Sequence, residues 1–188
     1  MMDAFSYLSV LLSIIIGLGM TQVLTAAGGL IRYRKHVRFY WPPLLWAITV
    51  LVIYVQMWWS TFGLRTYQNW TFASFSLVLL EPVCFYLLAA VVLPERIEAS
   101  GVDLREHYYD QHQWLFGFLF ATVLVSVLKE EALEHRLPQG FNLVFHVYML
   151  VLSVTGIVIR RPRYHEALAV IAAASVAVYI AMLFATLR

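Results

Sequence analysis

Apolar residues in this chain occur in six long runs separated by short polar segments. The runs cover residues 5–31, 41–62, 71–93, 114–128, 141–159 and 167–187. A transmembrane α-helix needs about 20 predominantly apolar residues, and most of the runs reach that length. The fourth run is short, but the segment before it contains no Pro or Gly, so we place this helix at 106–128. The pattern predicts an all-α, polytopic integral membrane protein, a single domain of six transmembrane helices.

Composition supports a membrane location. Of the 188 residues, 62% are hydrophobic and 13% are charged, and the mean hydropathy is +0.75. Soluble domains contain about 45–50% apolar residues, so a water-soluble core cannot accommodate this chain. The first apolar run is longer than the roughly 7–15-residue core of a signal peptide, and we expect it to remain as the first span. The apolar composition predicts the lipid bilayer as partner, and a net charge of only +2 predicts no nucleic acid partner.

Basic residues are distributed unequally between the two sides of the predicted bundle. Nine Lys and Arg residues lie in the segments that join spans one and two, three and four, and five and six, whereas four lie on the other side. Loops rich in Lys and Arg remain in the cytoplasm. We therefore predict that both termini lie outside, in the periplasm, with the chain in a bacterial inner membrane.

Glu81 lies near the middle of the third apolar run, where no water is available to solvate a carboxylate. An ionisable residue at that depth must be paired, protonated or functional. Three roles fit it: a proton or cation site, a contact with another subunit, or a neutral strut hydrogen-bonded to Gln56, Tyr86 or a backbone carbonyl. Pro82, directly after it, removes a backbone donor and is expected to kink the helix.

Three spans carry polar residues at helical spacing, which predicts inward-facing polar surfaces. Helical periodicity places Ser74 and Glu81 on one face of the third span, while Gln56 and His146 belong to polar faces of spans two and five. At about 1.5 Å per residue, Gln56 lies roughly 9 Å, Glu81 roughly 15 Å and His146 roughly 6–8 Å from the outer ends of their helices. We therefore predict one cavity that opens outward and ends at Glu81.

Small residues recur at every fourth position in the first and last apolar runs. The first-span stripe contains Ser9, Ser13, Gly17, Thr21, Thr25 and Gly29, and the last-span stripe contains Ala169, Ala173, Ala177, Ala181 and Ala185. Transmembrane helices associate through close van der Waals contact, which small residues permit. The two small-residue stripes therefore predict packing faces, either between these two spans or between protomers of a homo-oligomer.

The polar segment before the fourth run carries four groups that metal ions favour. On a helix, Asp103, Glu106, His107 and Asp110 follow i, i+3, i+4 and i+7 spacing and share a face. Carboxylates and imidazole ligate a divalent metal when another segment supplies further ligands. The alternative is an ordinary interfacial helix with i, i+4 interactions. Residues 129–136, after the fourth run, have a similar character, and we expect a solvated helix end there.

Motifs of known enzyme classes are missing from the sequence. It contains no Walker A loop, no dinucleotide-binding glycine turn, no His-Glu-x-x-His and no Gly-x-Ser-x-Gly, and it indicates no cofactor. The leading interpretation is a small channel or carrier for protons or small cations that acts through Glu81. An accessory or assembly subunit of a larger membrane complex is the first alternative, and an interfacial membrane enzyme that uses the Asp103 segment is the second.

Overall fold

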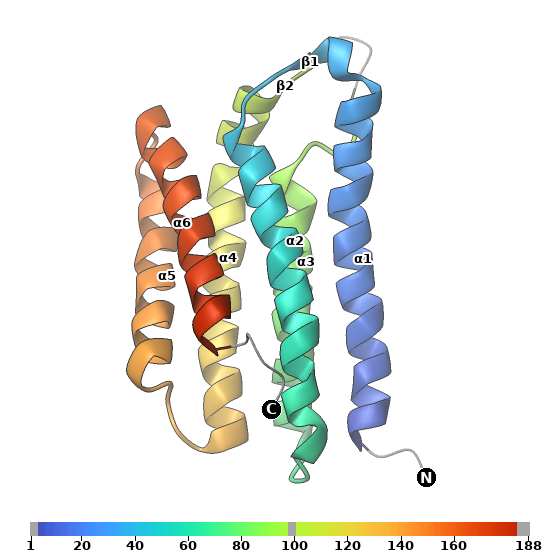
Figure 1. The fold of residues 1–188 in the computed structure, drawn as a ribbon, viewed down its shortest axis with the longest axis vertical. Coiled ribbons are helices and arrows are strands. Elements are labelled where there is room, and N and C mark those ends of the chain that lie inside the picture. The colour runs from blue at the N-terminus through green and yellow to red at the C-terminus, as the bar shows by residue number, and fades with distance from the viewer. Residues whose placement is uncertain (1–3, 98–100, 184–188) are drawn as a thin grey trace.

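The computed structural model describes residues 4–97 and 101–183 (Figure 1). Its six α-helices are α1 (Ala4–Arg32), α2 (Pro42–Thr61), α3 (Phe72–Val92), α4 (Leu104–Glu134), α5 (Gly140–Val158) and α6 (Pro162–Leu183). The connections contain the 3₁₀ helices η1 (Arg34–His36) and η2 (Phe62–Thr66) and the two-residue strands β1 (Val37–Arg38) and β2 (Val102–Asp103). The prediction of an all-α, membrane-type bundle is confirmed.

Five of the helices in the described chain are long and apolar enough to cross a membrane. α4 differs from them: it has 31 residues, but its first and last turns are polar. It begins at Leu104 and continues to Glu134, so it is longer at both ends than the predicted span 106–128. α3 continues through Pro82 without interruption. α6 starts at Pro162, one turn earlier than the predicted start of its span.

Local sequence signals determine where the helices begin. Pro42 and Pro162 occupy the first turns of α2 and α6, where an amide hydrogen has no partner within the helix. Thr71 and Ser74 form a reciprocal capping box at the start of α3, with amide-to-hydroxyl distances of 3.1 and 3.0 Å. Asp103 caps α4 by accepting hydrogen bonds from two backbone amides of its first turn. Each of these caps satisfies amides that would otherwise lack a partner.

The helices are arranged as a ring around the interior of the bundle (Figure 1). α1 packs on α2 and α3, α3 forms the most extensive interface with α4, and α4 packs on α5. α6 closes the ring by packing on α2 and, less extensively, on α5. The start of α1 and the end of α6 therefore lie at the same end of the bundle, together with η2 and the α4–α5 connection (Figure 1).

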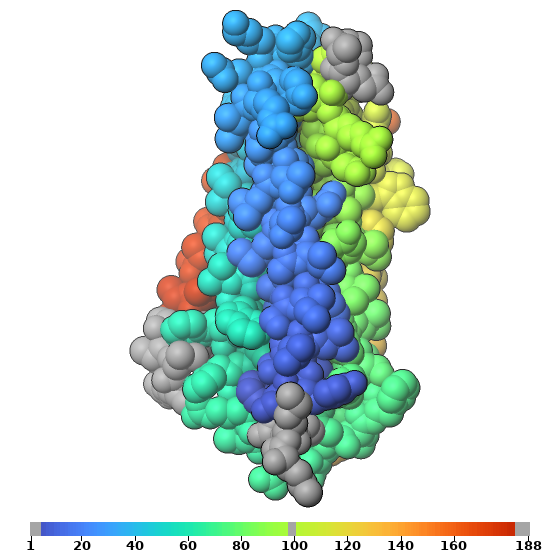
Figure 2. Space-filling model, turned by 90° about the vertical axis from the view of Figure 1, so that its right-hand side faces the viewer, coloured from blue at the N-terminus to red at the C-terminus, as the bar shows by residue number. Residues whose placement is uncertain are grey.

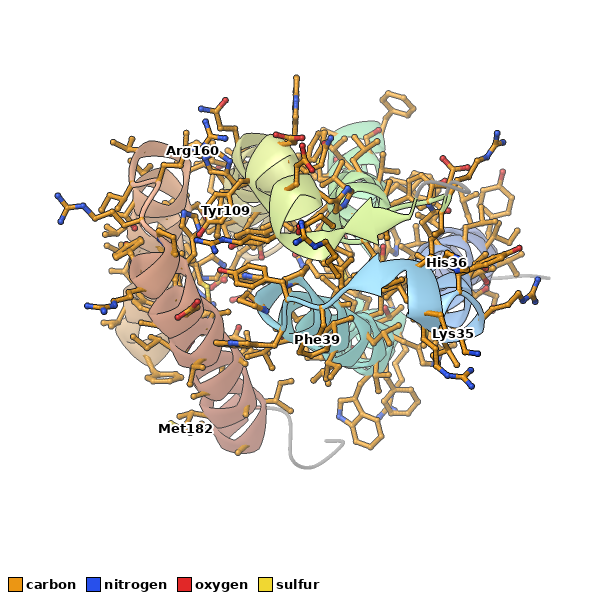
Figure 3. All side chains as sticks on the ribbon, turned by 90° about the horizontal axis from the view of Figure 1, so that it is seen from above. Lys35, His36, Phe39, Tyr109, Arg160 and Met182 are labelled. Carbon is orange, nitrogen blue, oxygen red and sulfur yellow. The ribbon has the colours of Figure 1, made fainter. Side chains whose placement is uncertain are left out.

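The opposite end carries most of the basic residues. There β1 pairs in parallel with β2, and Arg38 forms an ion pair with Asp103 at 3.4 Å. Figure 3 looks onto this end and shows Lys35 and His36 on one side of the molecule and Arg160 on the opposite side. The charge asymmetry found in the sequence is thus an asymmetry between the two ends of one bundle.

The small-residue stripe of α1 faces away from the rest of the chain. Ser13, Gly17 and Thr21 are exposed and Ser9 is half-buried, whereas the buried side of the helix carries larger residues such as Leu12. A methyl group added at Gly17 would have no heavy atom within 4 Å. Figure 2 shows α1 uncovered along its length on this face, between α2 and α3. The prediction that this stripe packs against the last span within one chain is therefore wrong.

The stripe of α6 follows the same trend. Ala169, at the start of the stripe, is buried, Ala173 is half-buried, and Ala177 and Ala181 are exposed, while Ala185 lies outside the described residues. α6 lies against α2 and α5, so its neighbours are not those that the periodicity suggested. In α1 the larger apolar residues outside the stripe form the contacts, because they bury more surface, whereas in α6 the contacting face includes Ala169 together with Leu168, Ala172 and Val176.

Close helix approach occurs instead at two other glycines. A methyl group at Gly19 of α1 would overlap the hydroxyl of Tyr54 on α2, and one at Gly156 of α5 would lie 2.6 Å from the Phe116 ring on α4. Both aromatic side chains are fully buried. Tyr54 is further fixed by an edge-on contact with Phe85, with 4.9 Å between ring centroids. These rings have little room to move, so hydrogen is the only side chain that fits opposite them.

We expect Gly19→Ala to lower the free energy of unfolding by about 1–3 kcal/mol, since overpacking displaces Tyr54 from a filled core. Gly17→Ala, two residues away on the open face, is the matched control and should change stability by less than about 0.5 kcal/mol. Thermal unfolding in mild detergent measures both. Equal effects of the two substitutions would contradict the assignment of the packing face.

Candidate functional site

A cavity of about 390 Å³ lies inside the ring of helices, toward the end where α2 and α4 finish. Every one of the six helices contributes to its lining, and most of the lining side chains are apolar. Polar groups enter it from five helices; they are Thr49, Gln56, Ser60, Thr61, Glu81, Thr122, Ser126, Lys129, Glu130, Glu134, Asn142, His146 and Tyr179. Apolar walls with a few convergent polar groups are typical of small-molecule sites.

An ion pair between Glu81 and Lys129 is the central feature of this cavity. The Lys129 ammonium lies 2.5 Å from a Glu81 carboxylate oxygen, joining the middle of α3 to the last turns of α4. The side chains are only 15% and 25% exposed, respectively, so both charges are largely withdrawn from solvent. A mostly buried charge is stabilised only by a partner of opposite sign. Glu81 is therefore paired in this structure.

The pairing corrects the expected surroundings of Glu81. Neither Gln56 nor Tyr86 is its partner, and Lys129 turns toward the cavity, whereas Glu131 and residues 134–136 at the same helix end are exposed, as expected. The signal that identifies Lys129 is helical spacing: Ser126, Lys129 and Glu130 continue the face of α4 that begins at Thr122. The apolar run stops at residue 128, so hydropathy alone ends the helix six residues too early.

A second polar network lies beside the ion pair and connects α4, α5 and α6. The Asn142 amide donates to Glu130 at 2.5 Å, and the Tyr179 hydroxyl donates to the Asn142 side-chain oxygen at 2.9 Å. His146 Nδ1 lies 2.7 Å from the Asn142 carbonyl oxygen, and its Nε2 lies 3.3 Å from the Ser126 hydroxyl. Because a carbonyl oxygen only accepts, Nδ1 carries the hydrogen. The network fixes the orientation of both Asn142 and His146.

The structure brings together three of the five polar residues proposed from the sequence. Gln56, Glu81 and His146 line the same cavity, on α2, α3 and α5. Ser74 does not reach it, because its side chain is buried in the cap of α3. Tyr86 is not among the lining residues either. Ser74 and Glu81 do lie two turns apart on one face of α3, but the Ser74 hydroxyl is hydrogen-bonded to Thr71 in the cap and is not available to the cavity.

Buried aromatic and histidine side chains fill the bundle beyond the cavity, toward its basic end. Tyr108 and His165 are joined by a 2.9 Å hydrogen bond, and the other ring nitrogen of His165 lies 2.7 Å from the Ile159 carbonyl oxygen. Trp46, which lines the cavity, makes an edge-on contact with Phe116 at 5.4 Å between centroids. Since these side chains are fully or almost fully buried, the cavity ends here.

The proposed metal face at the start of α4 is accounted for by structural contacts. Asp103 caps the helix and pairs with Arg38, and His107 Nε2 lies 3.2 Å from the Val91 carbonyl oxygen. Glu106 and Asp110 are exposed. No group of three or more His, Cys, Asp or Glu side chains that could hold a metal ion occurs within residues 4–97 and 101–183.

Comparison with known protein families, curated proteins and solved structures finds no match to this chain. The functional argument therefore rests on the geometry of the cavity.

The ion pair predicts strong energetic coupling between its two members. Glu81→Gln and Lys129→Met should each lower the free energy of unfolding by about 1–3 kcal/mol, less than the roughly 3–5 kcal/mol of a fully buried pair, because both side chains retain some exposure. The double variant should lose less than the sum of the single effects, since neither charge is left alone. Unfolding in detergent measures the cycle, and strictly additive losses would contradict the pairing.

Proposed function

We propose that this chain is a small membrane carrier or channel that moves protons or small cations through its internal cavity. The observation that carries this proposal is an ion pair, Glu81 with Lys129, that lines a cavity in an apolar helical bundle. Ionisable residues inside membrane segments commonly belong to ion or substrate pathways. For stability alone, well-packed apolar residues serve as well as a buried ion pair or better.

The ion pair suggests how the passage of a proton or cation can be coupled to the charge of Glu81. Lys129 acts as a resident cation on Glu81, so an entering proton or cation competes with it for the carboxylate. Protonation of Glu81 removes the attraction and leaves the Lys129 ammonium without its partner. Release of the proton restores the pair. Such a competition requires both residues to line the cavity, as they do, and it raises the charge of the pair by one when the proton is bound.

The orientation of the chain follows from the basic residues. Exposed Arg and Lys side chains concentrate at the end that carries β1 and β2, whereas Lys129, one of the few at the other end, is neutralised by Glu81. The positive-inside rule then places both termini and the cavity end outside, which is the periplasm for a bacterial inner membrane.

In a chain with Cys84 replaced, cysteine at Gln139 should react with an impermeant thiol reagent in intact cells, and cysteine at Lys35 should not. The reverse pattern would contradict this orientation.

We expect the double variant Glu81→Gln/Lys129→Met to keep its fold and lose transport. In liposomes with an imposed pH gradient, a trapped pH-sensitive dye should report proton flux with the wild-type chain and a flux near that of protein-free liposomes with the variant. Glu131→Gln, on an exposed residue next to the cavity-lining Glu130, is the control and should transport normally. Wild-type chain that carries neither protons nor Na⁺ would overturn the proposal, as would unchanged flux in the double variant.

A second candidate function, an accessory or assembly subunit of a larger membrane complex, is favoured by one observation. The small-residue stripe of α1 is exposed along a face that nothing in the described chain covers. Such stripes suit close approach of another helix.

Native mass determination in mild detergent separates the two functions. A stable complex with other chains that is lost in Gly17→Leu supports the accessory subunit. A monomer or a symmetric homo-oligomer supports the carrier.

A further inference from the structure

The charges that line the cavity do not balance. Glu81 is paired with Lys129, and Glu134 at the rim is paired with Arg136 at 2.6 Å. Glu130 is the remaining carboxylate, and no cation among the described residues forms an ion pair with it. The cavity therefore has an excess of one negative charge, located at Glu130.

One oxygen of the Glu130 carboxylate is held and the other is not. Oε2 accepts the hydrogen bond from Asn142, which is itself fixed by Tyr179. No donor in the described part of the chain reaches Oε1. A carboxylate accepts hydrogen bonds at both oxygens, and the half-buried Glu130 carboxylate, with only a neutral donor, lacks a counter-charge. The geometry leaves room at Glu130 for a donor that carries positive charge.

The walls beside Glu130 are aromatic and apolar. Phe145 and Tyr179 stack with 4.0 Å between ring centroids, and Phe85, Trp46 and Met149 continue the lining toward the deep end. Aromatic faces attract organic cations, and they bury apolar groups. Mg²⁺ and Ca²⁺ instead require several oxygen ligands, and the described residues contain no group of three or more His, Cys, Asp or Glu side chains that could hold a metal ion. The volume of about 390 Å³ lies within the range of small-molecule sites.

We infer that the cavity binds an organic ammonium compound, a primary or secondary amine with an aromatic or aliphatic tail, whose N–H donates to Glu130 and whose tail lies on the Phe145–Tyr179 wall. This inference deepens the proposed function and rests on it, since it names the class of cation that the carrier takes. Glu130 is the residue that recognises the organic cation, whereas the competition with Lys129 at Glu81 concerns the proton.

The test uses 2-phenylethylammonium as probe and the neutral 2-phenylethanol as its uncharged counterpart, titrated into the full chain in detergent by calorimetry. Wild-type chain should bind the cation saturably and the alcohol on the order of tenfold or more weakly, because a desolvated charge pair is lost. Glu130→Gln, whose amide oxygen still accepts from Asn142, should weaken cation binding by a similar factor and leave the alcohol unaffected. Glu131→Gln, on the adjacent exposed residue, should bind the cation as wild type does and also controls for partition into the micelle.

Several outcomes would overturn the inference. No saturable binding of the cation by wild type, equal affinity for cation and alcohol, or unchanged affinity in Glu130→Gln each contradicts it. If Glu130→Gln does not fold, the comparison of the two probes on the wild-type chain decides alone. Proton flux without amine binding would contradict this inference and leave the proposed function intact. Amine binding without flux would contradict the proposed function and identify a binding site in a chain that does not transport.

Discussion

The Glu81–Lys129 ion pair is the interaction on which the interior of this bundle depends. It joins α3 to α4 across the most extensive helix interface, in a region where lipid can solvate neither charge. Loss of either partner leaves the other uncompensated, so the two helices are held in one register. The same pair brings charge into an otherwise apolar interior, and the polar cavity forms around it.

α4 can be less apolar than its neighbours because of where it lies. It packs between α3 and α5, and the polar side chains from Thr122 to Glu130 that line the cavity face other helices, while its exposed polar side chains lie in its first and last turns. Lys129 and Glu130, two of the charges in the cavity, both come from its last turns. Its first turns supply Tyr108, which closes the bundle through its hydrogen bond to His165. One helix therefore contributes to the charged cavity at one end and to the sealed aromatic core at the other.

The two ends of the bundle differ in a way that suits a cavity with a single entrance. Toward the basic end, buried rings and hydrogen-bonded histidines fill the interior, and Trp46 marks where the cavity stops. Toward the other end, the lining extends to Ser60 and Glu134 near the ends of α2 and α4. Passage through the protein would require the aromatic end to open, and the tight contact between Phe116 and Gly156 lies on that route.

The sequence by itself determined the number of helices, their approximate limits and the polar faces that carry Gln56, Glu81 and His146. Long apolar runs can satisfy their backbone in a bilayer only as helices, and residues spaced by about 3.6 share a face. Only the tertiary structure decided that Lys129 pairs with Glu81 and that Gly19, not Gly17, makes the close contact. Helical periodicity indicates which side chains share one face of one helix. Which faces meet depends on the order and rotation of helices around the ring, and that choice results from many weak packing contacts between segments distant in the chain.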